Sequence, residues 1–226
     1  MCGRFFLSQN LDVLKREFSI KEVSYPYNPS YNIAPTQQVA VVVREQENSE
    51  NTLTSMRWGL IPSWAKDEKI GARMINARAE TIAEKPSFRQ ALLQRRCLIL
   101  ADGFFEWGVN PGKKEKQPFA IRLRSRKTFA FAGLWDHRMR GDGKEISGCT
   151  IITTEANSLI QRLHARMPLI LQKSYEDAWL AKETPPEKLM GFLERYPFNE
   201  MEMYPVTERV GSTKYNEPDC IIPANN

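Results

Sequence analysis

The sequence predicts an α+β fold, with a twisted, barrel-like and mainly antiparallel β-sheet core and peripheral helices. Short apolar runs of strand length recur along most of the chain, and only a few amphipathic helix patterns interrupt them. No segment repeats, and no apolar run approaches the roughly 20 residues that a membrane-spanning helix needs. The 226 residues, of which 42% are hydrophobic and 26% charged, fit one globular domain.

The first helix and the loop after it can be placed from residue spacing. Apolar residues recur at helical spacing after Asn10, whose side chain suits a helix cap, so residues 10–18 are expected to form a short amphipathic helix. Residues 24–32 are rich in proline, asparagine and tyrosine. This composition favours an irregular but ordered loop.

Strands are expected over most of the remaining chain. The buried runs 39–44 and 53–58 should pair through a polar hairpin connection at 45–51. Six further strands are expected, at 97–100, 104–107, 119–123, 128–134, 148–154 and 202–206. Helices are expected at 86–95, 155–163, 174–181 and 185–195. Polar turns should occupy 110–117 and 138–147, and the tail after Ser212 should be irregular.

Composition narrows the class of protein. The four cysteines are widely separated, with no Cys-x-x-Cys pair and only two histidines in the chain, which argues against a four-ligand zinc site and for free thiols in a reducing compartment. Charged residues interrupt the first twenty positions, so we expect no signal peptide and a cytoplasmic protein. A net charge of +5 permits contact with phosphates, although charge alone is weak evidence for it.

Cys2 is the most informative position because it directly follows Met1. Methionine aminopeptidase usually removes Met1 before a small second residue, which would leave an N-terminal cysteine with a thiol and an α-amine two bonds apart. Their ordinary pKa values, about 8.5 and about 7.7 to 8.0, give both groups some reactive form near neutral pH. Such a residue can attack an acyl carbon, or it can capture an aldehyde as a thiazolidine. A small buried apolar cysteine is the alternative interpretation.

Glu106 and His164 are candidates for proton transfer. Glu106 lies among aromatic residues on an expected strand, where burial would raise its pKa into the range of a general acid or base. An outward-facing strand glutamate is equally compatible with the pattern. His164 follows an expected helix and precedes Arg166, a place that suits a proton carrier, although a lone histidine is more often a satisfied polar residue.

Two further runs carry groups that could bind a substrate. Asn76, Arg78 and Glu80 place an amide, a guanidinium and a carboxylate within six residues. Asn76 could orient an amine or a carbonyl and Arg78 could hold a phosphate, or the run could form a helix cap followed by surface charge. Trp58 and Trp64 flank a turn with glycine and proline. Tryptophan usually packs in a core, but exposed rings beside arginines would form a platform for single-stranded nucleic acid.

Five motifs in order resemble those of the SOS response-associated peptidase (SRAP) family, and they span nearly the whole chain. They are Cys2-Gly3-Arg4-Phe5, Trp58-Gly59-Leu60-Ile61-Pro62, Asn76-Ala77-Arg78-Ala79-Glu80-Thr81, Ala101-Asp102-Gly103-Phe104-Phe105-Glu106-Trp107 and His164-Ala165-Arg166-Met167-Pro168. The departures are Leu100, Phe105 and Ala165, where many members have proline, tyrosine and an acidic or amide residue. They put only fine substrate positioning in doubt.

The resemblance implies a function. Members of this family recognise abasic sites in single-stranded DNA, including replication-fork DNA, and trap them as a covalent DNA-protein crosslink through the N-terminal cysteine. It further implies one SRAP domain over residues 2–226 with Met1 removed, no cofactor or metal, and a monomer that is nucleoid-associated when bound to DNA. The implied catalytic residues are Cys2, Asn76, Glu106 and His164. The implied DNA-binding residues are Arg4, Pro35, Thr36, Trp64, Arg78, Trp107 and Arg166.

Two other functions stay open from the sequence. The same N-terminal cysteine could act as a peptidase, either removing Met1 from its own chain or cleaving other proteins, with Glu106 and His164 assisting acyl transfer. The motifs could instead serve only folding and affinity in a non-covalent single-stranded DNA-binding module. The sequence also leaves open whether an imine intermediate leads to strand cleavage by β-elimination.

Overall fold

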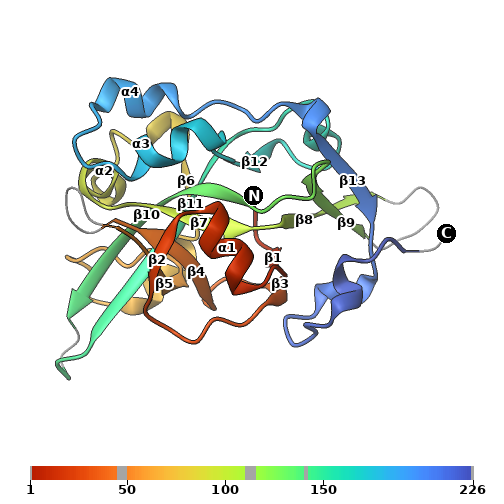
Figure 1. Ribbon diagram of the computed structural model, residues 1–226, viewed down its shortest axis with the longest axis horizontal. Coiled ribbons are helices and arrows are strands. Elements are labelled where there is room, and N and C mark those ends of the chain that lie inside the picture. The colour runs from red at the N-terminus through yellow and green to blue at the C-terminus, as the bar shows by residue number, and fades with distance from the viewer. Residues whose placement is uncertain (1, 45–49, 110–115, 140–141, 225–226) are drawn as a thin grey trace.

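A computed structural model describes residues 2–44, 50–109, 116–139 and 142–224 (Figure 1). Most of the hairpin connection expected at 45–51, most of the turn expected at 110–117 and part of the turn expected at 138–147 lie outside these residues.

Short strands dominate the described chain. The strands are β1 (Phe5–Leu7), β2 (Ile20–Val23), β3 (Ser30–Ile33), β4 (Gln38–Val43), β5 (Asn51–Trp58), β6 (Asn76–Arg78), β7 (Arg96–Ala101), β8 (Gly103–Val109), β9 (Lys116–Leu123), β10 (Phe129–Met139), β11 (Glu145–Glu155), β12 (Arg166–Pro168) and β13 (Met201–Pro205). The α-helices are α1 (Leu11–Glu17), α2 (Pro86–Gln94), α3 (Glu176–Leu180) and α4 (Pro186–Gly191). Single 3-10 turns are η1 (Glu68–Arg73), η2 (Ala79–Thr81), η3 (Ile160–Arg162), η4 (Lys173–Tyr175), η5 (Phe198–Glu200), η6 (Glu208–Gly211) and η7 (Pro218–Ile221).

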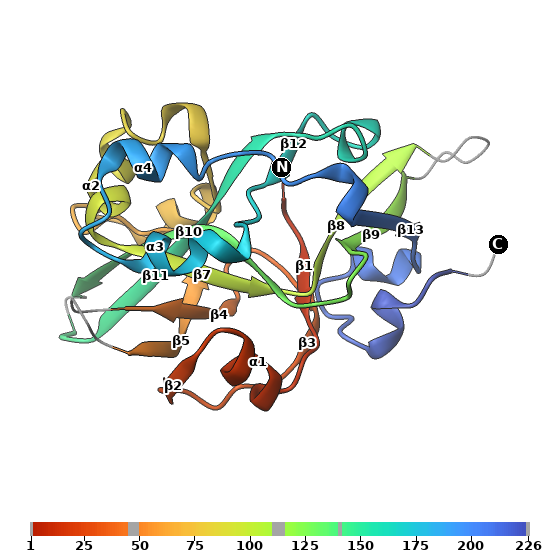
Figure 2. The same cartoon turned by 45° about the horizontal axis from the view of Figure 1, so that its top comes forward.

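The larger sheet closes on itself. Strands β11, β10, β7, β4 and β5 pair in that order, each antiparallel to the next. A parallel pairing of β5 with β11, which sets Arg57 opposite Gly148 and Trp58 opposite Cys149, completes the ring. A second sheet of five strands runs β13-β9-β8-β1-β3 beside it (Figures 1 and 2). The barrel-like, mainly antiparallel core expected from the sequence is therefore confirmed.

Strand β1 joins the two sheets. Its backbone pairs with β3 and β8 in the smaller sheet. The ring of Phe5 packs edge-on against Trp58 at 5.0 Å and against Phe131 at 5.7 Å, and both of these residues lie on barrel strands. Since Phe5, Trp58 and Phe131 are fully buried, burial of their aromatic area fixes β1 at the junction. The segment that begins with Cys2 is held there as a result.

Helices cover the outside of the barrel. Strand β7 is buried on both faces because one face lines the core and α3 packs beside the other. The indole nitrogen of Trp179 on α3 donates a hydrogen bond of 3.0 Å to the carbonyl oxygen of Cys97 on β7. All four cysteines are buried and none forms a disulfide. In the described part of the chain no helix has both the length and the apolar character needed to cross a membrane.

The structure corrects the extent of two expected elements. The helix expected at 185–195 is shorter, since α4 ends at Gly191. The polar turn expected at 138–147 is wrong at both ends, because β10 continues to Met139 and β11 begins at Glu145.

Two further expectations about local elements are corrected. The helix expected at 155–163 is wrong, because β11 continues to Glu155 and only the single turn η3 follows. The side-chain oxygen of Asn157 accepts hydrogen bonds from the backbone of Leu159 and Ile160, which favours a tight turn over a helix. The loop expected at 24–32 is wrong at its end, where β3 begins at Ser30.

Candidate active site

Cys2 lies three residues before the start of β1 and is fully buried. The side-chain nitrogen of Asn76 donates a hydrogen bond of 2.8 Å to the carbonyl oxygen of Cys2. Asn76 begins β6, which pairs in parallel with β11 and places Asn76 opposite Ile151. The other amide atom, Oδ1 of Asn76, is buried and has no hydrogen-bond partner among the described residues. Asn76 therefore holds the backbone of Cys2 and keeps an acceptor available beside it.

Glu106 reaches the same place from β8. Strands β1 and β8 are antiparallel, with Phe5 opposite Phe104, and the Phe105 N–H donates a hydrogen bond of 2.9 Å to the carbonyl oxygen of Arg4. Glu106 is the next residue after Phe105, so the pairing of β8 with β1 places it near the segment that carries Cys2. Burial raises the pKa of the Glu106 carboxyl to about 7, although the charge of Lys116 opposes this change. The expectation of a buried carboxyl with a raised pKa is borne out.

The thiol of Cys2 is less acidic than an exposed cysteine. Burial raises the pKa of Cys2 well above its ordinary value, and the negative charge of Glu106 raises it further. The expectation that the thiol supplies its reactive form without tuning is therefore wrong for this buried position. At neutral pH the Cys2 thiol keeps its proton until a base removes it.

His164 lies after the turn η3 and before β12. The backbone N–H of Arg166 donates a hydrogen bond of 2.9 Å to Nδ1 of His164, and partial burial lowers the pKa of this imidazole. We therefore assign a neutral ring with its proton on Nε2. A Cβ atom added to Gly108 on β8 would lie 2.5 Å from Leu163, so the turn that precedes His164 packs directly on the strand of Glu106.

The three arginines expected at a DNA interface differ in their contacts. Arg78 on β6 is exposed, and its side chain makes no hydrogen bond or ion pair with the described residues. Arg166 on β12 forms a two-pronged ion pair with Glu80. Arg4 is buried, and its guanidinium donates to Asn32 and to the carbonyl oxygen of Val210. A phosphate contact by Arg4 stays a prediction, since its contacts here are internal.

The aromatic and loop residues expected to contact DNA also differ in exposure. Trp64 has 60% of its surface exposed, whereas Trp107 is half-buried, with its ring 5.8 Å from the Arg4 guanidinium. Pro35 and Thr36 form a half-buried turn after β3. Thr36 has a φ of 72°, a strained value for a β-branched residue, and its N–H donates to the carbonyl oxygen of Trp58.

A stack of glycines holds the segment that leads to Trp64. A Cβ atom on Gly59, where φ is 144°, would lie 2.5 Å from the carbonyl oxygen of Gly71. A Cβ atom on Gly148 of β11 would lie 2.5 Å from the carbonyl oxygen of Gly59. Only glycine permits this approach, so the Trp58–Pro62 motif is pressed between η1 and the barrel. This contact sets the place from which Trp64 projects.

Sequence reasoning did not single out Lys116, an exposed residue at the start of β9. Its charge makes the smallest of the contributions that lower the pKa of Glu106 and of His164. Lys116 lies opposite Val109 in the pairing of β8 with β9, beyond Glu106 on the same strand pair. Nothing in the sequence marked it, because it belongs to a lysine-rich run that is typical of a solvated turn.

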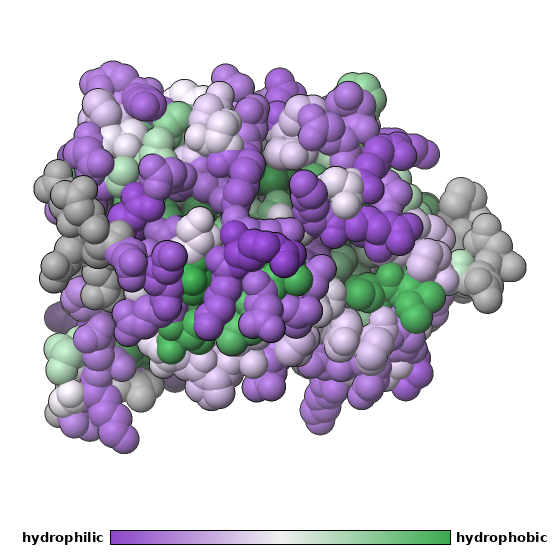
Figure 3. Space-filling view, viewed as in Figure 1, coloured by the Kyte–Doolittle hydropathy of each residue, from purple (hydrophilic) through white to green (hydrophobic). Residues whose placement is uncertain are grey.

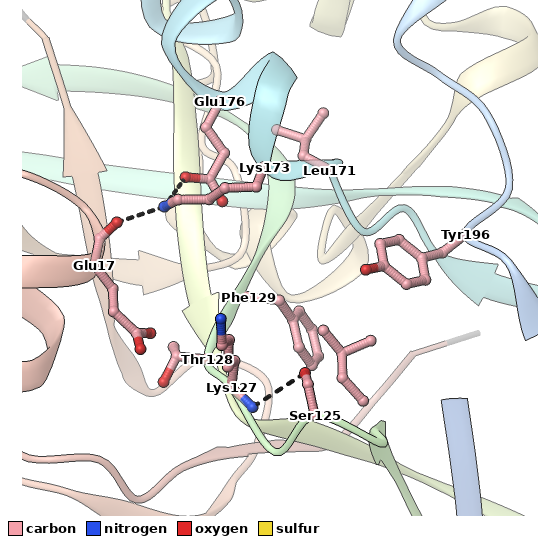
Figure 4. Close-up of a pocket in the computed structure, with 10 residues that line it drawn as sticks. Glu17, Ser125, Lys127, Thr128, Phe129, Leu171, Lys173, Glu176 and Tyr196 are labelled. Carbon is pink, nitrogen blue, oxygen red and sulfur yellow. Dashed lines mark hydrogen bonds and ion pairs between the residues drawn. The ribbon is translucent and has the colours of Figure 1, made fainter. Parts of the chain in front are cut away.

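A separate cavity of about 240 Å³ contains none of the expected site residues. It lies between β10 and the η4-α3 segment, and Figure 4 shows Lys173 between Glu17 and Glu176 on its wall, with Tyr196 facing them. Burial raises the pKa of Glu176 to about 6. The surrounding face is mostly hydrophilic in Figure 3, with smaller hydrophobic areas between polar side chains.

Comparison with known proteins identifies the family. A family model described as SOS response associated peptidase (SRAP) matches residues 1–213. The chain belongs to the SRAP family. It is 46% identical to the Bacillus subtilis (strain 168) protein named Abasic site processing protein YoqW. This match extends over 225 residues and covers 98% of this chain and 99% of that protein. The resemblance carried by the five sequence motifs is thereby confirmed.

More distant SRAP relatives preserve the match. The chain is 29% identical to the Rattus norvegicus protein named Abasic site processing protein HMCES. This match extends over 235 residues and covers 88% of this chain and 66% of that protein. The crystal structure of a protein from Bacteroides thetaiotaomicron has a TM-score of 0.86 and 25% identity, over 99% of this chain and all of that one. The fold of this chain is therefore shared with a solved structure over nearly its whole length.

Proposed function

We propose that this SRAP protein captures abasic sites in single-stranded DNA as a covalent thiazolidine through Cys2. The observation that carries the proposal is the buried Glu106 carboxyl, with a pKa of about 7, on the strand paired with the segment of Cys2. The names of the relatives, abasic site processing proteins, support DNA with abasic sites as the substrate. The proposal requires that Met1 is removed, because only then does Cys2 have an α-amine.

The first stage joins the amine to the sugar. An abasic deoxyribose exists partly as a ring-opened aldehyde, and the Cys2 amine adds to its C1′ carbon to form a carbinolamine. Glu106 in its protonated form donates a proton to the departing hydroxyl, which leaves as water and gives a protonated imine. A carboxyl with a pKa of about 7 is protonated in part of the population at neutral pH, so it can supply this proton.

The second stage closes the ring. Sγ of Cys2 adds to the imine carbon while the Glu106 carboxylate formed in the first stage takes the thiol proton. The raised pKa of the thiol explains why a base must act in this step. Because amine and thiol belong to one residue, the five-membered ring forms without a second bimolecular encounter. The net reaction joins aldehyde, amine and thiol and releases one water molecule.

Asn76 and His164 would assist as neighbours of these atoms. The hydrogen bond from Asn76 to the Cys2 carbonyl oxygen holds the backbone of Cys2 in place. The unpartnered Oδ1 atom of Asn76 would accept a hydrogen bond from the Cys2 amine and orient the nitrogen lone pair toward the aldehyde carbon. The Nε2–H of a neutral His164 would donate to the sugar oxygen and favour ring opening.

Basic, aromatic and loop residues around this site would bind the strand. Arg78 and Arg166 would contact phosphates flanking the abasic sugar, and Trp64 would stack on a base. Trp107 would close the pocket, and the strained Pro35-Thr36 turn would help to separate paired strands. Arg4, whose guanidinium lies over the Trp107 ring, would bind a phosphate beside that ring.

A denaturing gel tests this function. The protein is mixed with single-stranded abasic, single-stranded intact and double-stranded oligonucleotides, and a denaturation-resistant band is expected with the abasic single strand alone. Cys2→Ala should abolish the band. Cys2→Ser keeps the amine and should give only an imine, which borohydride reduction would trap. A normal yield from Cys2→Ala would overturn the proposal.

The same samples separate the alternatives. Binding of every single strand without a resistant band would indicate a non-covalent module. Cleavage of the abasic strand would indicate β-elimination from the imine. Intact mass measurement shows whether Met1 is absent, and persistence of Met1 in Cys2→Ala alone would point to self-processing by the thiol.

A further inference from the structure

The guanidinium of Arg166 is occupied by a carboxylate in this structure. Its Nη1 atom donates a hydrogen bond of 2.6 Å to Oε1 of Glu80, and Nη2 donates one of 3.0 Å to Oε2. This is the two-pronged geometry in which a guanidinium also binds two oxygens of a phosphate. Glu80 thus fills the position that a phosphate would take on Arg166.

Arg166 is anchored without Glu80. Its Nη2 atom also donates a hydrogen bond of 2.6 Å to the carbonyl oxygen of Thr153, and its backbone pairs with Glu155 of β11. Only 15% of the Arg166 side chain is exposed, and its Nε atom is buried with no partner among the described residues. These contacts would keep the guanidinium in place if the carboxylate left.

Glu80 is the more accessible member of the pair. It lies in the turn η2, directly after β6, and 47% of its side chain is exposed. The Arg166 guanidinium holds the pKa of Glu80 below its usual value, and the charge of Arg78 acts in the same direction. The carboxylate therefore stays ionised at neutral pH and lies within the field of two arginines.

We propose that Glu80 is a built-in competitor of DNA phosphate at Arg166, which weakens binding to undamaged single strands. The inference rests on the proposed function, since it takes Arg166 as a phosphate-binding residue. Exposed ion pairs are weak, so a phosphate can displace the carboxylate, but each binding event must first break the Glu80 contact. Abasic strands pay the same penalty when they bind, but the crosslink to Cys2 then retains them covalently, whereas intact strands dissociate.

The test compares affinities for a short, intact, fluorescein-labelled single strand by anisotropy. Glu80→Gln keeps the size of the side chain and removes its charge, and we expect it to bind about two- to fivefold tighter than wild type, the range that an exposed ion pair supports. Glu84→Gln is the matched control. It removes one negative charge from the same exposed segment, and the Glu84 side chain contacts no cation among the described residues.

A double-mutant cycle assigns the effect to Arg166. If Glu80 acts through this guanidinium, Glu80→Gln should leave the affinity unchanged in an Arg166→Ala background. Thermal melting checks that each variant is folded. The intact strand should also inhibit crosslinking of an abasic strand at lower concentration with Glu80→Gln than with wild type.

The outcomes separate this inference from the function beneath it. Wild type that crosslinks the abasic strand, together with Glu80→Gln that binds no tighter than Glu84→Gln, would overturn the inference alone. Weaker binding by Glu80→Gln would mean that Glu80 orients Arg166 instead of competing for it, and would also overturn it. Wild type that neither binds nor crosslinks single strands would remove the proposed function and this inference together.

Discussion

The amide nitrogen of Asn76 lies 2.8 Å from the carbonyl oxygen of Cys2 and donates a hydrogen bond to it. The contact joins β6, which pairs with β11 of the larger sheet, to the segment that leads into β1 of the smaller sheet. It makes the position of the candidate nucleophile depend on the pairing of β6 with β11. A shift in the register of β6 would therefore displace the backbone of Cys2.

Removing this contact should slow capture of abasic DNA. Asn76→Ala loses both the donor and the acceptor, and we expect the crosslinking rate to fall by about ten- to a hundredfold because the amine is no longer held in line. Asn76→Asp keeps the acceptor and loses the donor, so an intermediate rate is expected. Single-turnover crosslinking on denaturing gels measures both. A wild-type rate in Asn76→Ala would exclude a positioning role.

Glu106 should control the pH dependence of crosslinking. Capture starts from the protonated carboxyl, and the carboxylate that takes the thiol proton is formed in the first stage, so the rate should fall as the pH rises through about 7. Glu106→Gln should lower the rate by about a hundredfold or more and remove this fall. Rates measured from pH 5 to about 9 with a constant-ionic-strength buffer test this. The same fall in Glu106→Gln would assign it to another group.

The same carboxyl should affect stability with a defined sign. Its pKa is raised from 4.5 to about 7 on folding, so the folded protein binds the proton more tightly. The stabilisation of the folded protein by the protonated Glu106 carboxyl is complete below pH 4.5 and is lost as the pH rises through about 7. Glu106→Gln should therefore be more stable than wild type at pH 8, by about 1–3 kcal/mol, with a smaller difference at pH 5. Denaturant unfolding at both pH values gives the comparison.

Trp64 should contribute to DNA affinity and little to stability. Its ring is 60% exposed, so Trp64→Ala should leave the melting temperature nearly unchanged. Loss of one stacked base should weaken binding to an intact single strand by about 1–3 kcal/mol. Phe198→Ala is the matched control, since Phe198 is 56% exposed on η5 and has no place in the proposed interface. Equal losses in the two variants would argue against stacking on Trp64.

Arg78 should contribute to the salt dependence of DNA binding. If it contacts one phosphate, Arg78→Ala should reduce the slope of log affinity against log salt by about 0.7, the value for one phosphate on a single strand. Arg89→Ala removes the same charge from the exposed face of α2 and should leave the slope unchanged. Anisotropy titrations at several salt concentrations give both slopes. Identical slopes for wild type and Arg78→Ala would remove Arg78 from the interface.

The sequence predicted long elements well and very short ones poorly. The runs that became β4 and β7 are apolar and of ordinary strand length, so local composition was sufficient. Strands β6 and β12 have three residues each and exist because β11 offers them backbone partners, which no local pattern reveals. Strand β1 was missed because it is buried on both faces and shows no alternation.

The candidate site was predicted by motif resemblance more than by local chemistry. Residue patterns alone suggested a reactive Cys2 and a buried Glu106 but left an ordinary structural role open for each. They placed His164 at the end of a helix that does not exist, because the spacing of Leu159 and Leu163 imitates a helical face. The state of the thiol could not be predicted either, since it depends on complete burial by chain segments far away in the sequence.

The anchorage of Arg4 has a consequence for protein synthesis. Its guanidinium is bonded to the carbonyl oxygen of Val210, 206 residues further along the chain, and Asn32 donates to the same oxygen. These contacts cannot form until almost the entire chain has left the ribosome. The strand beside Cys2 is therefore secured late, and a nascent or truncated polypeptide would carry the cysteine without the frame that directs its chemistry.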